Sequence, residues 1–402
     1  MKHLAKRTTF LSTIVLAMLT GLALTACKPE TAQSPLAIPE VVATQVPDLT
    51  RQRPIPPPGT PRPTPTRLPD RGVRAEVAQE VTTQANTSSL LGERFRFFGP
   101  ATDGKTVVGT IRQDNKDVVV AVDLASGKAQ ILSDKQDQIN EPRVSGRYVV
   151  WTAAYQLYVY DLEEAQLKQL SFGATIRQAR ISGHIAVFWE QISGSQGTRA
   201  EIHGYDLLAG KDFLINAQPQ ARAPEISSDW IVYKAGVEQP SYAGLWAVNI
   251  KTQEDIHLGR VFIDTLDSPY VPLYAIDAPW VAWSRGGQSP SPALYLYNLD
   301  TRTAYTVTIP SWGESLSEPS PITINPIYLT MSNRVVIFSG YYQDLGYDIE
   351  RQVFFSLPTN APYGFDKLGW SITGDQLVWV LSSGPYGQEE SHLYTAKIIR
   401  DK

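Results

Sequence analysis

One short phrase recurs along this sequence, and it constrains the fold more than any other feature. Residues 144–151 read VSGRYVVW, and related phrases follow as ISGHIAVFW, ISSDWIVY, IDAPWVAW, MSNRVVIF and ITGDQLVW. Each joins a turn-forming residue to a run of β-branched and aromatic residues, a pattern typical of a strand that follows a tight turn. The turn positions recur 37 to 55 residues apart, at Gly104, Gly146, Gly183, Ser228, Ala278, Asn333 and Gly374.

A second strand phrase follows each of these turns, as in LYVYDLEEAQ, IHGYDLLAGK and LYLYNLDTRT. With the strand before the turn and a short apolar segment at the end, a complete repeat contains four strands, which we call A to D. Seven repeats of a four-stranded unit predict an all-β fold, a seven-bladed β-propeller. A six-bladed ring is the alternative. The seventh repeat has no strand D, so we expect a segment within residues 73–91 to supply it; a linker helix there is the other possibility.

The repeat pattern, P-x-x-S-G-x-x-V-V-W followed by L-Y-x-Y-D-L-x-x-G-K, resembles the repeats of TolB-type β-propellers and of the non-catalytic propeller of prolyl oligopeptidases. The resemblance covers residues 97–402 and implies the fold rather than an activity, because the repeated residues build blades. The sequence departs from TolB in having no N-terminal α/β domain, and from the oligopeptidases in having no hydrolase domain. Their catalytic activity is therefore not implied.

The N-terminal region has the features of an export signal. Lys2, Lys6 and Arg7 precede an apolar segment from Phe10 to Leu24, which is too short to span a membrane comfortably. The sequence LTAC at 24–27 resembles the lipobox of bacterial lipoproteins, which implies cleavage after residue 26 and acylation of Cys27. Cys27 is the sole cysteine, so it has no disulfide partner within the chain. An ordinary signal peptide with an incidental cysteine is the alternative.

The segment after Cys27 is predicted to be a tether. Twelve prolines lie between Pro29 and Pro69, a density that excludes helices and sheets and favours extended polyproline II. The sequence thus divides into a signal peptide (1–26), a disordered tether (27–72), a ring-closing strand or linker (73–96) and the propeller (97–402). We expect an extracytoplasmic protein held to the cell membrane by its lipid, on its periplasmic or cell-surface side.

The balance of charged residues and the sequence motifs reduce the number of functional classes to be considered. Without the three basic residues of the signal, 33 basic residues stand against 40 acidic ones, and no basic stripe is present, so nucleic acid is not an expected partner. There is no G-x-S-x-G nucleophile motif and no zinc-binding pattern among the five histidines. The acidic groups around Asp134 and around Asp344 do not have the spacing of a calcium loop. We therefore predict no catalytic residue, metal or cofactor.

Two functional classes remain. The first is a non-enzymatic module that binds a protein, a peptide or a glycan of the cell envelope, and the second is a glycan-active or hydrolytic propeller. The long connections between strands B and C and between strand D and the next strand A lie on one predicted face, where we expect the partner to bind. The candidate ligand-binding residues on that face are Trp312, Tyr341, Tyr342, Asp344, Tyr347, Asp348 and Tyr386.

Overall fold

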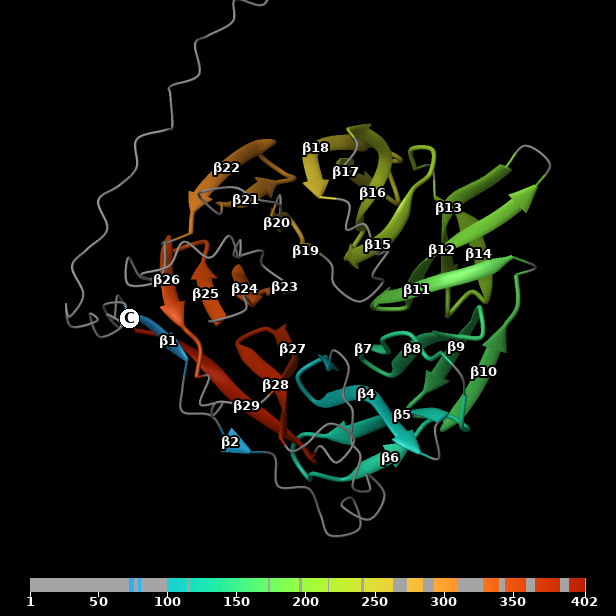
Figure 1. Cartoon of the computed structure of the whole chain (residues 1–402), viewed down its shortest axis with the longest axis horizontal. Coiled ribbons are helices and arrows are strands. Elements are labelled where there is room, and N and C mark those ends of the chain that lie inside the picture. The colour runs from blue at the N-terminus through green and yellow to red at the C-terminus, as the bar shows by residue number, and fades with distance from the viewer. Residues whose placement is uncertain are drawn as a thin grey trace, which may run out of the picture. The chain divides into compact units, whose positions relative to one another are not determined.

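Seven antiparallel sheets, six with four strands and one with five, surround a central axis in this protein (Figure 1). The computed structural model describes residues 72–75, 79–80, 100–113, 116–136, 138–172, 174–194, 197–215, 217–239, 242–262, 273–284, 293–309, 328–339, 344–358, 366–383 and 390–401. The seven-bladed β-propeller is therefore confirmed, and the six-bladed alternative is excluded. Cys27 and the predicted tether, apart from its last residue Gly72, lie outside the described residues. No helix among the described residues is long and apolar enough to cross a membrane.

The first three blades follow the predicted order from strand A at the axis to strand D at the rim. Their repeats place one tight turn after strand A and another after strand C. Blade 1 consists of β3 (Ala101–Thr102), β4 (Thr106–Gln113), β5 (Lys116–Asp123) and β6 (Ala129–Ile131); blade 2 of β7 (Arg143–Ser145), β8 (Tyr148–Ala153), β9 (Gln156–Asp161) and β10 (Gln166–Leu170); blade 3 of β11 (Thr175–Ser182), β12 (Ile185–Gly194), β13 (Gly197–Asp206) and β14 (Lys211–Leu214).

Blades 4 to 6 repeat this arrangement. Blade 4 consists of β15 (Arg222–Ser227), β16 (Trp230–Gln239), β17 (Tyr242–Asn249) and β18 (Asp255–Phe262); blade 5 of β19 (Tyr274–Asp277), β20 (Trp280–Ser284), β21 (Ala293–Asn298) and β22 (Thr303–Thr308); blade 6 of β23 (Tyr328–Ser332), β24 (Val335–Ser339), β25 (Asp344–Asp348) and β26 (Val353–Ser356).

Blade 7 is assembled from both ends of the propeller sequence. Its inner strands are β27 (Asp366–Thr373), β28 (Gln376–Ser383) and β29 (Glu390–Arg400), and its outer strand is β1 (Val73–Ala75), which pairs antiparallel with β29. The short β2 (Gln79–Glu80) pairs with β29 as well. The segment from which we expected a ring-closing strand thus contributes β1 and β2 to blade 7.

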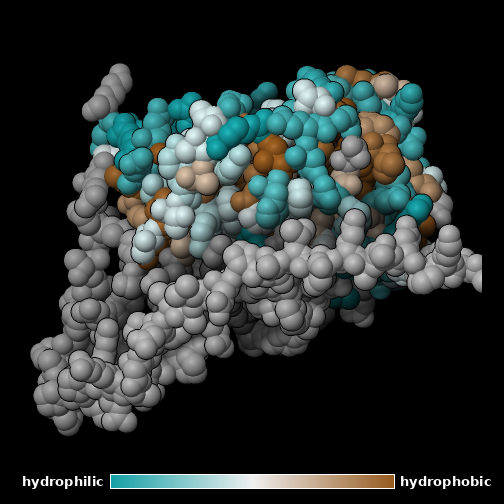
Figure 2. All heavy atoms as spheres, turned by 90° about the horizontal axis from the view of Figure 1, so that it is seen from above, coloured by the Kyte–Doolittle hydropathy of each residue, from teal (hydrophilic) through white to brown (hydrophobic). Residues whose placement is uncertain are grey.

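The core lies between the blades. Seven clusters of buried apolar side chains occupy the seven interfaces between neighbouring sheets. Val73 of β1 is 3% exposed and packs in the cluster of Trp370 and Trp379, between blades 6 and 7. The edge of the ring is mainly hydrophilic with separate hydrophobic patches (Figure 2). Among the described residues, the large apolar side chains that are exposed include Leu208 and Leu214 of blade 3 and Tyr305 of blade 5.

The repeated aspartate or asparagine at the end of strand C shapes the turn that follows. Asp161 accepts hydrogen bonds from the backbone N–H groups of Glu163 and Glu164, and Asp206 accepts them from Leu208 and Ala209. Such Asx turns explain why the sequence repeats a polar residue at this place after each tyrosine-rich strand. The Asp and Asn residues of the second phrase are therefore structural.

Candidate functional site

A cavity of about 440 Å³ lies on the axis of the propeller. Strand A of every blade contributes to its wall, and side chains of a strand alternate between its two faces. Two tiers of residues therefore face the cavity in each blade, one residue and three residues before the turn position. The turn tier consists of Asp103, Ser145, Ser182, Ser227, Asp277, Ser332 and Thr373; the middle tier of Ala101, Arg143, Arg180, Glu225, Ala275, Thr330 and Ser371.

The turn tier links each blade to the next. The hydroxyl of Ser145 accepts a hydrogen bond from the backbone N–H of Gly183 at 2.9 Å, and Ser182 accepts one from Ser228 at 3.0 Å. The same contact continues around the ring: the N–H of Ala278 donates to Ser227 at 3.1 Å, that of Arg334 to Asp277 at 3.4 Å, and that of Gly374 to Ser332 at 2.9 Å.

Blade 1 departs from this pattern. Asp103 instead accepts hydrogen bonds from the N–H groups of Lys105 and Thr106 within its own turn. Blades 7 and 1 are joined one tier deeper, where the N–H of Thr102 donates to the hydroxyl of Ser371 at 3.2 Å. The turn tier is thus largely used in holding the ring together.

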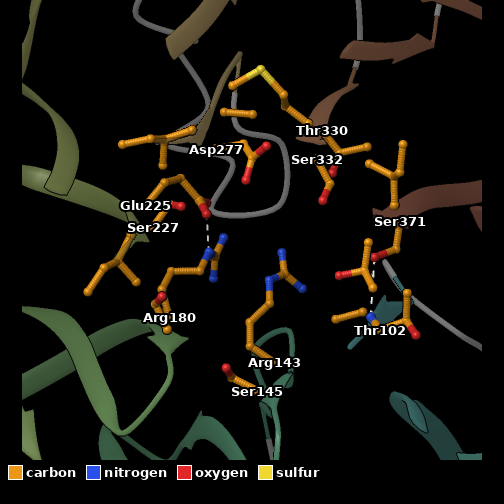
Figure 3. A pocket seen from close by; sticks show the side chains of 18 of the residues that line it. Thr102, Arg143, Ser145, Arg180, Glu225, Ser227, Asp277, Thr330, Ser332 and Ser371 are labelled. Carbon is orange, nitrogen blue, oxygen red and sulfur yellow. Dashed lines mark hydrogen bonds and ion pairs between the residues drawn. The ribbon is translucent and has the colours of Figure 1, made fainter. Parts of the chain in front are cut away.

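The middle tier is strongly asymmetric. Blades 2 to 4 contribute the charged residues Arg143, Arg180 and Glu225, whereas blades 5, 6, 7 and 1 contribute small residues or residues with a hydroxyl group. Figure 3 shows the guanidinium groups of Arg143 and Arg180 reaching into the cavity from one side. Because the opposite wall carries short side chains, the free volume lies between the arginines and that wall.

An ion-pair network fixes the two arginines. Arg180 has a side chain 4% exposed, and its guanidinium contacts Glu225 at 2.6 Å and Glu141 at 3.3 Å. Arg143 contacts the same carboxylate oxygen of Glu141 at 2.5 Å and donates to the carbonyl of Pro142 at 3.2 Å. A guanidinium has five N–H donors in a planar fork. Arg143 can therefore bind an anionic or carbonyl group in the cavity while it stays paired with Glu141.

Asp277 is the carboxyl group across the cavity from these arginines (Figure 3). Burial raises its pKa above the ordinary value of 3.8, and hydrogen bonds from the backbone of Arg334 and Asn333 oppose this rise. Tyr274, beside it in the wall, is buried and donates its hydroxyl hydrogen to the carbonyl of Ala223. The cavity thus combines guanidinium donors, hydroxyl groups and a carboxyl group, a set that suits a polar ligand with both donors and acceptors.

The predicted ligand-binding residues fall into two groups. Trp312, Tyr341, Tyr342 and Tyr386 lie outside the described residues, so their role stays a prediction. Asp344, Tyr347 and Asp348 are in β25 and are buried, at 0%, 5% and 0% exposure. Tyr347 packs on Phe354, and Asp348 pairs with Arg400 at 2.7 Å and caps the turn after strand C through the N–H of Arg351. We correct the prediction for these three residues, because buried side chains of the blade cannot contact a partner.

Sequence reasoning missed the cavity itself. The signal was present in the aligned phrases, where the third residue before the turn changes from Arg143 and Arg180 to Glu225 and then to small residues. Repeated charged residues at a position that faces the axis indicate more than blade packing. Within the described ranges, no three His, Cys, Asp or Glu side chains are grouped so that they could hold a metal ion.

No protein-family model matches this sequence, and no curated protein matches it either. Solved structures do. An oligogalacturonate lyase in complex with manganese is 10% identical with a TM-score of 0.52, and the match covers 75% of this chain and 89% of that one. The β-propeller domain of the trilobed protease from Pyrococcus furiosus, described as having an open velcro topology, is 14% identical with a TM-score of 0.53 over 76% and 97% of the two chains.

An acylaminoacyl peptidase from Pyrococcus horikoshii is 13% identical with a TM-score of 0.53. The match covers 75% of this chain and 52% of the peptidase, so this chain spans about half the length of that enzyme. TolB from Acinetobacter baumannii is also similar, at 16% identity over 55% of each chain, but its TM-score is 0.41. At these identities the comparisons show a β-propeller fold that enzymes and other proteins share, and the fold alone does not assign an activity.

Proposed function

We propose that this protein is a lipid-anchored, extracytoplasmic β-propeller that binds a protein, peptide or glycan of the cell envelope without transforming it. The observation that carries the proposal is the axial cavity, which presents fixed donors and acceptors on a rigid ring. Arg143 and Arg180 are held by carboxylates, and the serines of the turn tier are held by backbone N–H groups of the next blade. Groups fixed in this way favour recognition of a ligand, since they are preorganised for it.

The proposed ligand enters the cavity with a carboxylate or carbonyl group directed at Arg143. Bidentate hydrogen bonding between a guanidinium and a carboxylate fixes orientation as well as providing energy. The hydroxyl-bearing residues of the opposite wall, Thr330 and Ser371, would contact the remaining polar groups of the ligand. Residues of the long connections, among them Trp312, Tyr342 and Tyr386, would contribute a second contact surface on the other face.

The cavity is tested by partner capture. Full-length protein with Arg143→Gln would be crosslinked in native membranes and compared with wild type and with Arg112→Gln, an equal change of charge at a half-exposed arginine of blade 1. We expect loss of a specific crosslinked species with Arg143→Gln only. Equal capture by all three proteins would exclude the cavity as the binding site.

The alternative, a glycan-active or hydrolytic enzyme, is tested directly by turnover. Wild-type protein would be incubated with peptides and with polysaccharides that include oligogalacturonates, and product formation would be measured. Turnover that is abolished by Arg143→Gln or Asp277→Asn would replace the binding proposal with an enzymatic one.

The proposed anchor is tested at Cys27. A Cys27→Ala variant should accumulate as uncleaved precursor and should not incorporate labelled palmitate, because acylation requires the thiol. Normal processing and labelling of this variant would show that the protein is not anchored through Cys27.

A further inference from the structure

Four side chains from three neighbouring blades form a stack of alternating rings and guanidinium groups. The guanidinium of Arg177 lies 5.4 Å from the ring centre of Tyr155 and 5.9 Å from that of Trp189, and the guanidinium of Arg222 lies 5.8 Å from the Trp189 ring. We call Tyr155, Arg177, Trp189 and Arg222 the arginine–aromatic ladder. Tyr155 comes from the B–C turn of blade 2, Arg177 and Trp189 from blade 3, and Arg222 from blade 4.

The ladder is built by the blade repeat. Arg177 and Arg222 occupy the same position in their blades, six residues before the turn positions Gly183 and Ser228. In each blade the register of the inner strand shifts directly after the arginine, and the next residue has a positive φ, 47° at Gln178 and 51° at Ala223. Such bulges re-aim side chains and are frequent near functional sites. Two blades therefore present an arginine at the same place by the same local distortion.

The ladder is separate from the axial cavity. Arg177 is near the beginning of β11, whereas the cavity is lined by the last residues of that strand, Arg180 to Ser182. Tyr155 is in the B–C turn, on the face that also carries the long connections. The ladder thus lies near the beginning of these inner strands, whereas the turn tier lies at their other end.

Arg177 differs from the arginines of the cavity in its partners. Arg143 and Arg180 each contact a carboxylate, but Arg177 forms no ion pair among the described residues. Its Nε atom is buried and has no hydrogen-bond partner within the described part of the chain. Buried polar atoms are normally paired, so an unpaired N–H donor in a native site indicates a missing acceptor.

The geometry points to a carboxylate as that partner. Stacking on an aromatic ring orients a guanidinium plane and leaves its in-plane N–H groups available, and these match the two oxygens of a carboxylate. We infer that the arginine–aromatic ladder binds acidic side chains of a protein or peptide segment. Attraction between its cations and aromatic rings keeps the site ordered before the ligand arrives.

Two observations favour a peptide over an acidic glycan. Two guanidinium groups already lie over the half-buried ring of Trp189, so that ring is not an open platform on which a sugar could stack. Tyr, Trp and Arg are also the residues enriched in the energetic centres of protein–protein interfaces. Tyr155, whose exposed fraction is 47%, would add an apolar contact at the edge of this site.

The inference is tested with the full chain and two fluorescein-labelled peptides, one of alternating Glu and Ala and one of alternating Lys and Ala. We expect anisotropy titrations at low salt to show saturable binding of the Glu peptide only, weakened when salt is raised because the contacts are ionic. Arg177→Gln should weaken this binding about tenfold, the loss of one charge-assisted contact. Arg177→Lys should retain part of the affinity, since the charge remains but the planar fork is lost.

The matched control is Arg199→Gln, which removes the same charge from an exposed arginine of blade 3 outside the ladder. This variant should bind the Glu peptide within about twofold of wild type. Equal weakening by Arg199→Gln and Arg177→Gln would show a diffuse charge effect and overturn the inference. So would absence of Glu-peptide binding to wild type, or binding of an oligogalacturonate in its place. Arg143→Gln separates this inference from the proposed cavity. Weakening of Glu-peptide binding by Arg143→Gln and not by Arg177→Gln would place the peptide in the cavity and overturn the inference.

Discussion

The hydroxyl of Ser145 accepts a hydrogen bond from the backbone N–H of Gly183, and these two residues belong to adjacent blades. Each is also part of the repeated phrase of its own blade. The serine before one turn is thus bonded to the turn residue of the next repeat. This relationship gives the Ser-Gly pair of the phrase two roles, forming a turn and joining neighbouring sheets.

The contribution of this contact is measurable. Ser145→Ala should lower the free energy of unfolding by about 1 kcal/mol, the typical net value of one hydrogen bond. In a domain of this size the melting temperature should then fall by roughly 2 °C. Ser193→Ala, at an exposed position near the end of β12, is the control and should leave the melt unchanged. Identical melts for both variants would show that the interblade hydrogen bond adds nothing to stability.

Ring closure depends more on the apolar contact of β1 than on its charges. Val73 is buried between blades 6 and 7, whereas Arg74 and Asp401 form a pair at 2.6 Å with side chains 49% and 48% exposed. Val73→Ala should cost roughly 1–2 kcal/mol through lost burial and the cavity left behind. Arg74→Ala should cost less than about 1 kcal/mol. Chemical denaturation of both variants measures the two values, and a larger loss with Arg74→Ala would reverse this ranking.

The buried ion cluster of the cavity should be sensitive to the loss of its central cation. Arg180→Met leaves the carboxylates of Glu141 and Glu225 without this guanidinium and should destabilise the protein by about 3–5 kcal/mol. Adding Glu225→Gln to this variant should restore part of the loss, because Glu141 still pairs with Arg143 and the carboxylate that lost its ion pair is replaced by a neutral amide. Urea titrations of the single and double variants form the test. A double variant less stable than Arg180→Met would mean that the two residues do not act as a pair.

Asp277 should make stability depend on pH in a defined direction. Burial raises the carboxyl pKa in the folded protein above 3.8, so the folded state keeps its proton where the unfolded chain has lost it. The contribution of this group is therefore fully present below about pH 3.8 and is lost as pH rises through the raised pKa. Asp277→Asn keeps an oxygen to accept the N–H of Arg334 and does not titrate.

Relative to wild type, the Asp277→Asn variant should therefore gain stability between about pH 4 and pH 7. Unfolding free energies of both proteins at these two values give the difference directly. A difference that stays constant, or that shrinks as pH rises, would contradict a raised pKa. Ser332→Ala, in the same tier but without a titrating group, should show no such change.

The features of this structure that the sequence predicts are those that repeat from blade to blade. A tight turn between strands A and B recurs in every blade together with the strands beside it, as at Gly146, Gly183 and Gly374. Such periodic local patterns are strong indicators of architecture. Asp348 was misinterpreted because an aspartate near the tyrosines of one long connection resembles a surface site. In the structure it is the strand-C residue that caps a turn, as Asp161 and Asp206 do in their blades.

The sites were harder to predict because they combine residues from different repeats. The three residues Arg143, Arg180 and Glu225 each look like isolated charges in a strand, and only the closed ring brings them to one axis. Likewise, Tyr155 and Arg177 become neighbours through the contact between blades 2 and 3. A single sequence shows which side chains alternate between the two faces of a strand. It does not show which side chains of different blades meet in the closed ring.

The pairing of β1 with β29 also sets an order of events for a chain that is synthesised from its N-terminus. Arg74 and Asp401, which meet at this seam, are separated by 327 positions in sequence. Residues 73–75 are synthesised before any blade, yet their partner strand is the last to emerge. β1 and β2 therefore have no partner strand until β29 has been synthesised, so ring closure is a late, non-local step. During that interval the open seam exposes a strand edge and apolar surface, the stage at which such a chain most needs protection from aggregation.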